Sequence, residues 1–154
     1  MKSRNDLTQA DIDTIINGAD VCHVAMIDDS GLPYVLPFNF GYSNGRLYIH
    51  SGPEGKKVEI WKTNPLVCVA FSVGYDLRVQ NESVACSYSM RYKSVLIHGT
   101  IDPVTDLDEK KRILNIIMKK YTGREDFSYS LPAITNVKVF EIMPHKIEGR
   151  SYGY

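Results

Sequence analysis

Apolar and polar residues alternate over much of this chain, which is the two-residue period of half-buried β-strands. Hairpin-turn sequences at 28–31 and 43–45 separate the first three of these segments, so we expect those strands to pair antiparallel. A set of short strands with few helices is typical of a closed or nearly closed antiparallel barrel. Six segments have this pattern or a continuous apolar run, at residues 21–27, 34–42, 47–50, 66–73, 93–101 and 137–142. The sequence therefore predicts a mainly β protein, a β-barrel with helices.

Three other segments repeat their apolar residues with the period of an α-helix. In the first, Thr8 can serve as the N-cap, with Asp11 three residues later to complete a capping box. In the third, Gly123 supplies a C-terminal stop. The three predicted helices span about residues 8–17, 53–63 and 107–121.

One polar segment, residues 76–87, lacks any clear period and is predicted to be a long connection near the rim of the barrel. No repeat, low-complexity tract or linker divides the sequence. We therefore expect a single domain over residues 1–154.

Overall charge gives no sign of a partner, because 18 basic and 18 acidic side chains leave a formal net charge of zero. Such a chain has no global field to attract nucleic acid or an anionic membrane, so we expect neither as a partner. No apolar run is long enough for a membrane span or a signal peptide. The three cysteines, Cys22, Cys68 and Cys86, are predicted to be reduced thiols of a cytoplasmic protein. Cys22 and His23 have no companion ligand pair, so no metal site is expected.

Chemistry is best indicated where a strand ends at His50 and a helix begins within a few residues. Ser51 or Gly52 can serve as N-cap, and Glu54 can complete a capping box from Ser51. The unpaired N–H groups of a helix start carry partial positive charge and favour an anion.

Two adjacent lysines, Lys56 and Lys57, lie in this first helical turn, where the helix dipole disfavours cations. A phosphate monoester lying between them and the free N–H groups accounts for their position. Two solvated lysines balanced by Glu54 and Glu59 account for it equally well.

Residues 32–42 form an aromatic-rich segment in which alternation places Tyr34, Phe38 and Phe40 on one face. Pro33 and Pro37 cannot donate to a ladder, so this strand is predicted to be an edge strand or to be bulged. A flat ring can lie against such a strand and bond its free backbone groups. An ordinary core strand is the alternative. In a third segment, 87–99, polar, basic and aromatic residues precede an apolar stretch that is typical of a buried strand. Such a segment suits the rim of an anionic cofactor site.

In this order, these three segments resemble the FMN-binding split-barrel family that includes pyridoxamine 5′-phosphate oxidase, and in particular its nitroimidazole-resistance (Nim-like) branch. The resemblance covers about residues 21–153 and is most specific at 48–51, followed by Lys56 and Lys57, and at 91–99. It implies a six-stranded antiparallel FMN-binding split barrel that forms a homodimer with the flavin at the interface. FMN is the implied cofactor, with FAD as an alternative.

The resemblance also implies roles for individual positions. Lys56 and Lys57 match the residues that grip the flavin phosphate, and His50 and Ser51 match contacts to the phosphate and ribityl chain. Ser94 matches a polar contact to the flavin. The strand along the isoalloxazine corresponds to Val35, Leu36, Pro37, Phe38, Asn39 and Phe40. Weaker candidates, supplied across the dimer interface, are Arg91, Tyr92, Lys146 and Arg150.

One departure from the oxidases concerns the substrate. They end with basic and histidine residues that clasp the substrate phosphate, whereas no histidine follows Arg150 here. The resemblance therefore implies an oxidoreductase that uses NAD(P)H to reduce a small organic acceptor, such as a nitroimidazole or a quinone, rather than pyridoxamine phosphate. A non-catalytic flavin carrier or sensor is the alternative, and a haem or deazaflavin protein, with His50 or His98 as a haem ligand, is a third. The sequence identifies no catalytic residue.

Overall fold

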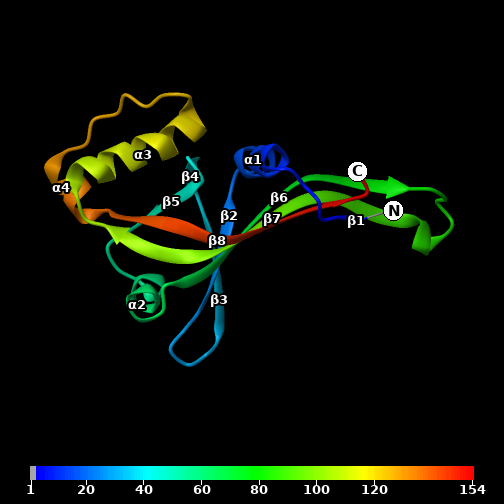
Figure 1. Ribbon diagram of the computed structural model, residues 1–154, viewed down its shortest axis with the longest axis horizontal. Coiled ribbons are helices and arrows are strands. Elements are labelled where there is room, and N and C mark those ends of the chain that lie inside the picture. The colour runs from blue at the N-terminus through cyan, green and yellow to red at the C-terminus, as the bar shows by residue number, and fades with distance from the viewer. Residues whose placement is uncertain (1–2) are drawn as a thin grey trace.

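The computed structural model describes residues 3–154, and its strands form one curled antiparallel sheet (Figure 1). Their order is β3-β2-β6-β7-β8-β5-β4, and the short β1 pairs with the end of β8. The mainly β class is confirmed, but the prediction of six strands is wrong, because the described chain forms eight. The strands are β1 (Ser3–Arg4), β2 (Cys22–Ile27), β3 (Pro33–Phe38), β4 (Phe40–Ser43), β5 (Arg46–Ser51), β6 (Leu66–Val79), β7 (Tyr88–Val104) and β8 (Lys138–Tyr152).

The predicted strand 34–42 is divided in the structure at Asn39, and its halves have different partners. β3 pairs only with β2, whereas β4 pairs with β5, so the two halves form the two ends of the strand order. The expectation of an edge strand at Pro33 and Pro37 is therefore confirmed. Because Asn39 joins β3 to β4, the chain itself connects the two edges of the curled sheet.

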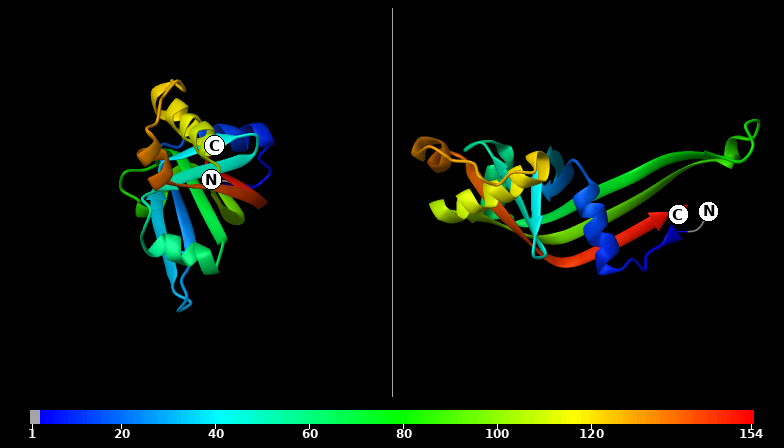
Figure 2. Two further views of the ribbon diagram at one scale, coloured as in Figure 1. Left: turned by 90° about the vertical axis from the view of Figure 1, so that its left-hand side faces the viewer. Right: turned by 90° about the horizontal axis from the view of Figure 1, so that it is seen from above.

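The polar segment 76–87 is shorter as a connection than predicted. β6 continues to Val79 and β7 begins at Tyr88, so the two strands form a long hairpin arm that projects beyond the helices (Figures 1 and 2). The register between these strands shifts between Val73 and Asp76, around Gly74, which has a φ of 67°. The sequence lacks a clear period here because both faces of the arm are exposed, so burial imposes no alternation.

Four α-helices and one short 3₁₀ helix accompany the sheet in the part of the chain that the structure describes. The predicted capping box of α1 is confirmed: the Asp11 N–H donates to the Thr8 hydroxyl at 3.2 Å, and the Thr8 N–H donates to Asp11 at 3.0 Å. The stop at Gly123 is also confirmed, with a left-handed φ of 74°. α4 was not predicted. The helices are α1 (Gln9–Gly18), α2 (Lys56–Thr63), α3 (Leu107–Thr122), α4 (Leu131–Asn136) and the 3₁₀ helix (Ala85–Ser87).

The main core lies on the inner face of the sheet and fixes the position of α2. Trp61 of α2 packs against Phe38 of β3, with ring centroids 6.0 Å apart, and against Phe140 of β8 at 4.9 Å. Phe40 packs edge-on against Phe71 of β6 at 5.1 Å. Full burial of such a side chain contributes about 1.5–3 kcal/mol. This packing holds the first turn of α2 close to β3.

α3 and α4 form a second layer at the end of the sheet that lies away from the arm (Figure 1). Ile113 and Ile117 of α3 are buried together with Ile134 of α4 and Tyr48 of β5. None of the described helices is long and apolar enough to cross a membrane. The three cysteines are free.

Candidate functional site

Two of the predicted segments meet where the ladder between β4 and β5 ends. Phe40 of β4 pairs with Ile49 of β5, and beyond this pair the strands no longer form a ladder. Asn39 and His50, the next residues of the two strands, therefore lie where the ladder opens. A surface cavity of about 670 Å³ begins at His50 and Ser51 and is bounded on its other side by α4. The unpredicted helix thus lies beside His50 and Ser51, whereas Lys56, Lys57 and residues 35–40 do not line this cavity.

The open edge of β3 carries free backbone groups. Pro37 pairs with His23 of β2 but has no N–H, so this pair cannot exchange both ladder hydrogen bonds. Hydrogen-bonded and non-bonded pairs alternate, which makes Val35 and Ala25 a non-bonded pair as well. The N–H and C=O of Val35 therefore point away from β2, toward the open edge. The Val35 side chain is 59% exposed beside them.

The start of α2 differs from the sequence prediction. The helix begins at Lys56 with Gly55 as N-cap, and no side chain caps it. The predicted caps at Ser51 and Gly52, and the predicted capping box to Glu54, are therefore wrong. The Ser51 hydroxyl donates instead to the carbonyl of Gly52 at 2.8 Å. Gly55 has a φ of 128°, which only glycine adopts readily, so the loop turns sharply and leaves the first N–H groups of α2 without a protein cap.

The two lysines have different surroundings. Lys56 Nζ lies 2.9 Å from Asp28 and 4.7 Å from the ring centroid of Tyr34, which brings it against β3. The Lys56 ammonium lowers the pKa of the Asp28 carboxyl, by its hydrogen bond before its charge. Lys57 forms no ion pair with any described residue, and its Nζ lies 3.5 Å from the position that a Cβ on Gly55 would occupy.

Neutralisation of the lysines by Glu54 and Glu59 is not observed. Glu59 pairs with Lys62 at 2.7 Å, and Glu54 forms no salt bridge within the described part of the chain. Lys57 is therefore the cation that remains available for an anion at the start of α2. The charge of Lys56 is already paired with Asp28.

His50 contributes a partly buried imidazole beside these residues. Its Nδ1 is buried without a hydrogen-bond partner among the described residues. Desolvation lowers the pKa of His50 below its ordinary value of 6.5, so the ring is neutral at physiological pH. A buried, unpaired ring nitrogen is costly unless a further group bonds it.

The third predicted segment, residues 87–99, is part of β7 and does not lie at the start of α2. Arg91 of β7 pairs with Asp76 of β6 in the arm and lies over the ring of Tyr154. The ring of Tyr92 packs against Tyr152 at a centroid distance of 5.8 Å. Both are therefore held by residues of the arm and of the end of β8, not by α2.

Ser94, Lys146 and Arg150 lie along β7 and β8. Ser94 is directly opposite Arg150, whose Nε donates to the Ser3 hydroxyl at 2.8 Å. Lys146 pairs with Glu148 at 2.7 Å. A cavity of about 500 Å³ is lined by Tyr92, Ser94 and Arg150 among others. One chain thus forms two separate groups of predicted site residues, one at α2 and one along β7 and β8.

Other features of the site were missed. The sequence contained a signal for α4, since Ser130 can serve as N-cap and Pro132 lies in the first turn; the Ala133 N–H donates to the Ser130 hydroxyl at 3.4 Å. The contact between Lys56 and Asp28 had no local signal. No group of three or more metal-ligating side chains occurs in the described residues. His98, a haem-ligand candidate, bonds Glu148 through Nε2 at 2.9 Å.

Comparison with known proteins places this fold. Residues 8–151 match the family model for pyridoxamine 5′-phosphate oxidase. The chain belongs to this family. Its sheet is that of the family's split barrel, as expected from the resemblance. No curated protein matches the chain significantly.

Solved structures agree with the family assignment. A proposed 5-nitroimidazole antibiotic resistance protein from Bacteroides thetaiotaomicron is 43% identical, with a TM-score of 0.87 over 97% of this chain and 87% of that protein. An FAD-binding protein from Mesorhizobium loti is 26% identical, with a TM-score of 0.70 over 99% and 100% of the two chains. An FAD and heme binding protein from Mycobacterium smegmatis is 16% identical, with a TM-score of 0.84 over 100% and 75%, and shows the fold alone.

Proposed function

We propose that this member of the pyridoxamine 5′-phosphate oxidase family is a cytoplasmic FMN-dependent oxidoreductase that reduces a small organic acceptor with electrons from NAD(P)H. A nitroimidazole or a quinone is the class of acceptor. The observation that carries the proposal is the 43% identity, over 97% of the chain, to a proposed 5-nitroimidazole resistance protein. FMN is preferred to FAD on the family resemblance, and the FAD-binding relative keeps the larger flavin as an alternative.

The residues at the start of α2 fit the phosphate of a flavin mononucleotide. The uncapped N–H groups of Lys56 and Lys57, the free ammonium of Lys57 and the turn at Gly55 favour a dianion there. His50 and Ser51 lie on the adjoining strand end, where the buried Nδ1 of His50 lacks a partner. These residues would hold the phosphate and the start of the ribityl chain.

The open edge of β3 fits the polar side of a flat ring. The N–H and C=O of Val35 point toward that edge, and the exposed face of Val35 and Pro37 offers apolar contact. Residues 35–40 would therefore orient the ring system, which supplies the hydride and electron transfer chemistry when bound. The protein contributes position, exclusion of water and the hydrogen bonds at the ring's edge.

A homodimer completes the proposal. Several large apolar side chains are exposed on one chain: on the outer face of the sheet, Val35 is 59% and Leu66 61% exposed, and on the arm, Leu77 is 57% exposed. Exposed apolar side chains of this kind offer apolar surface for an interface between two chains. Association of two chains through these surfaces would bury it. It would also allow Arg91, Tyr92, Lys146 and Arg150 of one chain to reach the flavin held at α2 of the other.

An absorbance spectrum tests the flavin. The purified protein, incubated with FMN and desalted, should keep the near-ultraviolet and blue bands of a bound flavin at one equivalent per chain. Colourless protein after desalting would overturn the assignment of a flavin. The same samples, incubated with FAD, decide between the two flavins.

Turnover separates the enzyme from a carrier or sensor. The loaded protein should oxidise NADH or NADPH steadily when a 5-nitroimidazole or a benzoquinone is present, and slowly without it. Retention of flavin without acceptor-dependent oxidation would support the carrier or sensor instead. Light scattering during gel filtration measures the dimer independently of either result.

A further inference from the structure

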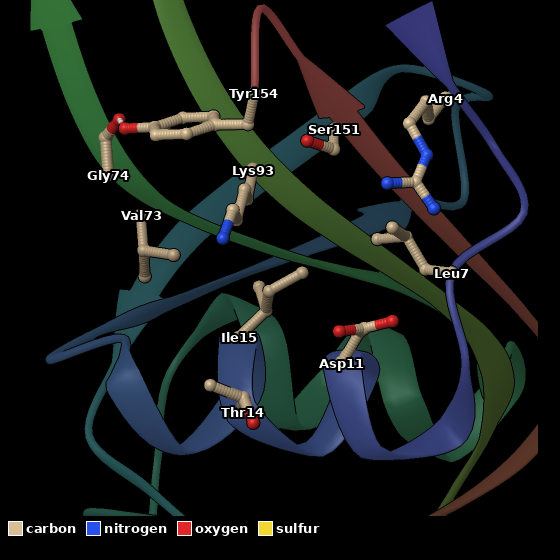
Figure 3. Close-up of a pocket in the computed structure, with 10 residues that line it drawn as sticks. All are labelled: Arg4, Leu7, Asp11, Thr14, Ile15, Val73, Gly74, Lys93, Ser151 and Tyr154. Atoms are coloured by element: carbon tan, nitrogen blue, oxygen red, sulfur yellow. Dashed lines mark hydrogen bonds between the residues drawn. The ribbon is translucent and has the colours of Figure 1, made fainter.

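A separate cavity of about 260 Å³ lies between α1 and the strands at the base of the arm (Figure 3). Lys93 of β7 and Ser151 of β8 are a directly opposed pair in its wall. Ser94 and Arg150, the next residues along these strands, belong to the predicted flavin contacts and project from the opposite face. The cavity is therefore distinct from the proposed flavin site.

Two polar groups enter this cavity without a hydrogen-bonding partner. Ser151 is only 4% exposed, and its hydroxyl forms no hydrogen bond with any described residue. The ammonium of Lys93 lies 4.8 Å from the ring centroid of Tyr154 but has no ion pair or hydrogen bond within residues 3–154. Figure 3 shows both groups pointing into the same space. The hydroxyl and the ammonium therefore keep their hydrogen-bonding capacity free toward the cavity, where one ligand can bond both.

The charged side chains that line the cavity are Lys93, Arg4 and Asp11, two cations and one carboxylate. The guanidinium of Arg4 points toward the cavity, and its ion pair with the exposed Asp6 is 3.2 Å long. Asp11 is the acidic group that lines the cavity, and its Oδ2 accepts hydrogen bonds from the N–H and the hydroxyl of Thr8. These bonds, more than the charges of Arg4 and Lys93, lower the pKa of Asp11. Asp11 therefore remains ionised and offsets one of the two cations, which leaves the lining of the cavity with one net positive charge.

The other walls and the size of the cavity restrict the ligand. Leu7, Ile15 and Val73 supply apolar surface opposite the charged groups. The hydroxyl of Tyr154 donates to the carbonyl of Gly74, so the tyrosine closes one side. The volume lies below the range of about 300–1,000 Å³ that is usual for drug-sized ligands. A short acid fits, whereas a nucleotide does not.

We propose that this cavity binds a small aliphatic carboxylate. The carboxylate lies between Lys93, the Ser151 hydroxyl and Arg4, and its alkyl chain contacts Leu7, Ile15 and Val73. Such a ligand satisfies both unpartnered groups and balances the excess positive charge at once. Neither a neutral nor a cationic molecule of the same shape does so.

Three probes of matched size test the proposal: butyrate, butyramide and n-butylamine, titrated into the ¹⁵N-labelled protein and followed by NMR. Butyrate should bind saturably with one equivalent per chain and shift the amides of Lys93, Ser151 and Val73. Butyramide and butylamine should bind at least tenfold more weakly. Equal binding of butyrate and butyramide, or shifts confined to other parts of the chain, would overturn the proposal.

Two variants and a control locate the site. Lys93→Met keeps the length of the side chain and should weaken butyrate at least about tenfold, while Ser151→Ala, which removes one hydroxyl, should weaken it about threefold to tenfold. Lys111→Met, on the surface of α3, should leave binding unchanged. Should Lys93→Met fail to fold, Arg4→Gln at the exposed β1 removes the other positive charge of the cavity and should also weaken butyrate binding. Wild-type affinity in Ser151→Ala and in the charge variant would refute the assignment.

Discussion

The hydroxyl of Tyr121 accepts a hydrogen bond from the backbone N–H of Phe40 at 3.1 Å. The same hydroxyl donates to the carbonyl of Asp20 at 2.8 Å. Phe40 is the first residue of β4, directly after the point where the strand leaves β2 for β5. An N–H at such a break has lost its ladder partner, and a side chain from the end of α3 replaces it.

Tyr121→Phe removes this replacement while keeping the ring. The Phe40 N–H and the Asp20 carbonyl both lose their partner, so unfolding free energy should fall by about 1–2 kcal/mol. Urea denaturation measures the change. Tyr88→Phe is the control, because its hydroxyl bonds the carbonyl of Glu82 in the exposed arm at 3.0 Å, and it should cost less than about 0.5 kcal/mol. Equal effects of the two variants would show that the break does not depend on Tyr121.

Lys110 makes the corresponding contact for α4. The residue is buried, and its Nζ donates to the carbonyl of Ile134 at 3.0 Å and to that of Val137 at 2.8 Å, at the end of α4. Lys110→Met should therefore cost about 1–3 kcal/mol, since buried carbonyls lose a charged donor. Lys111→Met, whose exposed partner Asp108 is 3.7 Å away, should change stability by less than about 0.5 kcal/mol. Hydrogen exchange should show α4 opening first in Lys110→Met, and unchanged protection there would contradict the prediction.

These two contacts could not be predicted from the sequence, because each joins residues that are far apart in the chain. The capping box at Thr8 and the stop at Gly123 depend on residues a few positions apart, and both were predicted correctly. Where the strand divides at Asn39, the Phe40 N–H donates to the hydroxyl of Tyr121, far away in the chain, and no local pattern encodes that contact. The segment 76–87 lacked a period because the arm has no buried face in one chain.

In the candidate site, too, local features were predictable from the sequence and contacts between distant residues were not. The sequence placed Lys56 and Lys57 at a helix start, but both lysines looked alike. Their difference arises from Asp28, which reaches Lys56 from the turn between β2 and β3. Pro33 and Pro37, in contrast, predicted the edge strand correctly, because a missing N–H is a local property.

Gly55 should be required at the start of α2. Its φ of 128° lies in a region that side chains with a Cβ avoid, so Gly55→Ala should cost about 1–3 kcal/mol or move the loop. Gly52→Ala is a matched control, because its φ is not in the left-handed region and no atom lies within 4 Å of the added Cβ. Thermal unfolding compares the two variants. An equal loss in Gly52→Ala would place the constraint elsewhere in the loop.

Flavin retention should distinguish the two lysines. Lys57→Gln removes the free cation and should weaken FMN by about tenfold to a hundredfold, the range for a hydrogen bond to a charged group. Lys56→Gln should weaken it less, because Lys56 is already paired with Asp28. Fluorescence titration of FMN measures both affinities. Riboflavin, which lacks the phosphate, should bind the wild type and Lys57→Gln equally, and a loss of riboflavin affinity would assign Lys57 to another part of the flavin.

His50 should make stability depend on pH in a defined direction. Burial lowers its folded-state pKa below 6.5, so the unfolded chain takes up a proton first as the pH falls. The stability that neutral His50 contributes is complete above the unfolded-state pKa of 6.5 and declines below it, until the folded state also protonates. The slope cannot exceed about 1.4 kcal/mol per pH unit. Urea denaturation of wild type and His50→Gln from pH 8 to 5, without flavin, isolates this contribution, because all other titrating groups cancel in the difference. The unfolding free energy of the wild type minus that of His50→Gln should fall as the pH drops below 6.5, and a constant or rising difference would show that the imidazole is not desolvated.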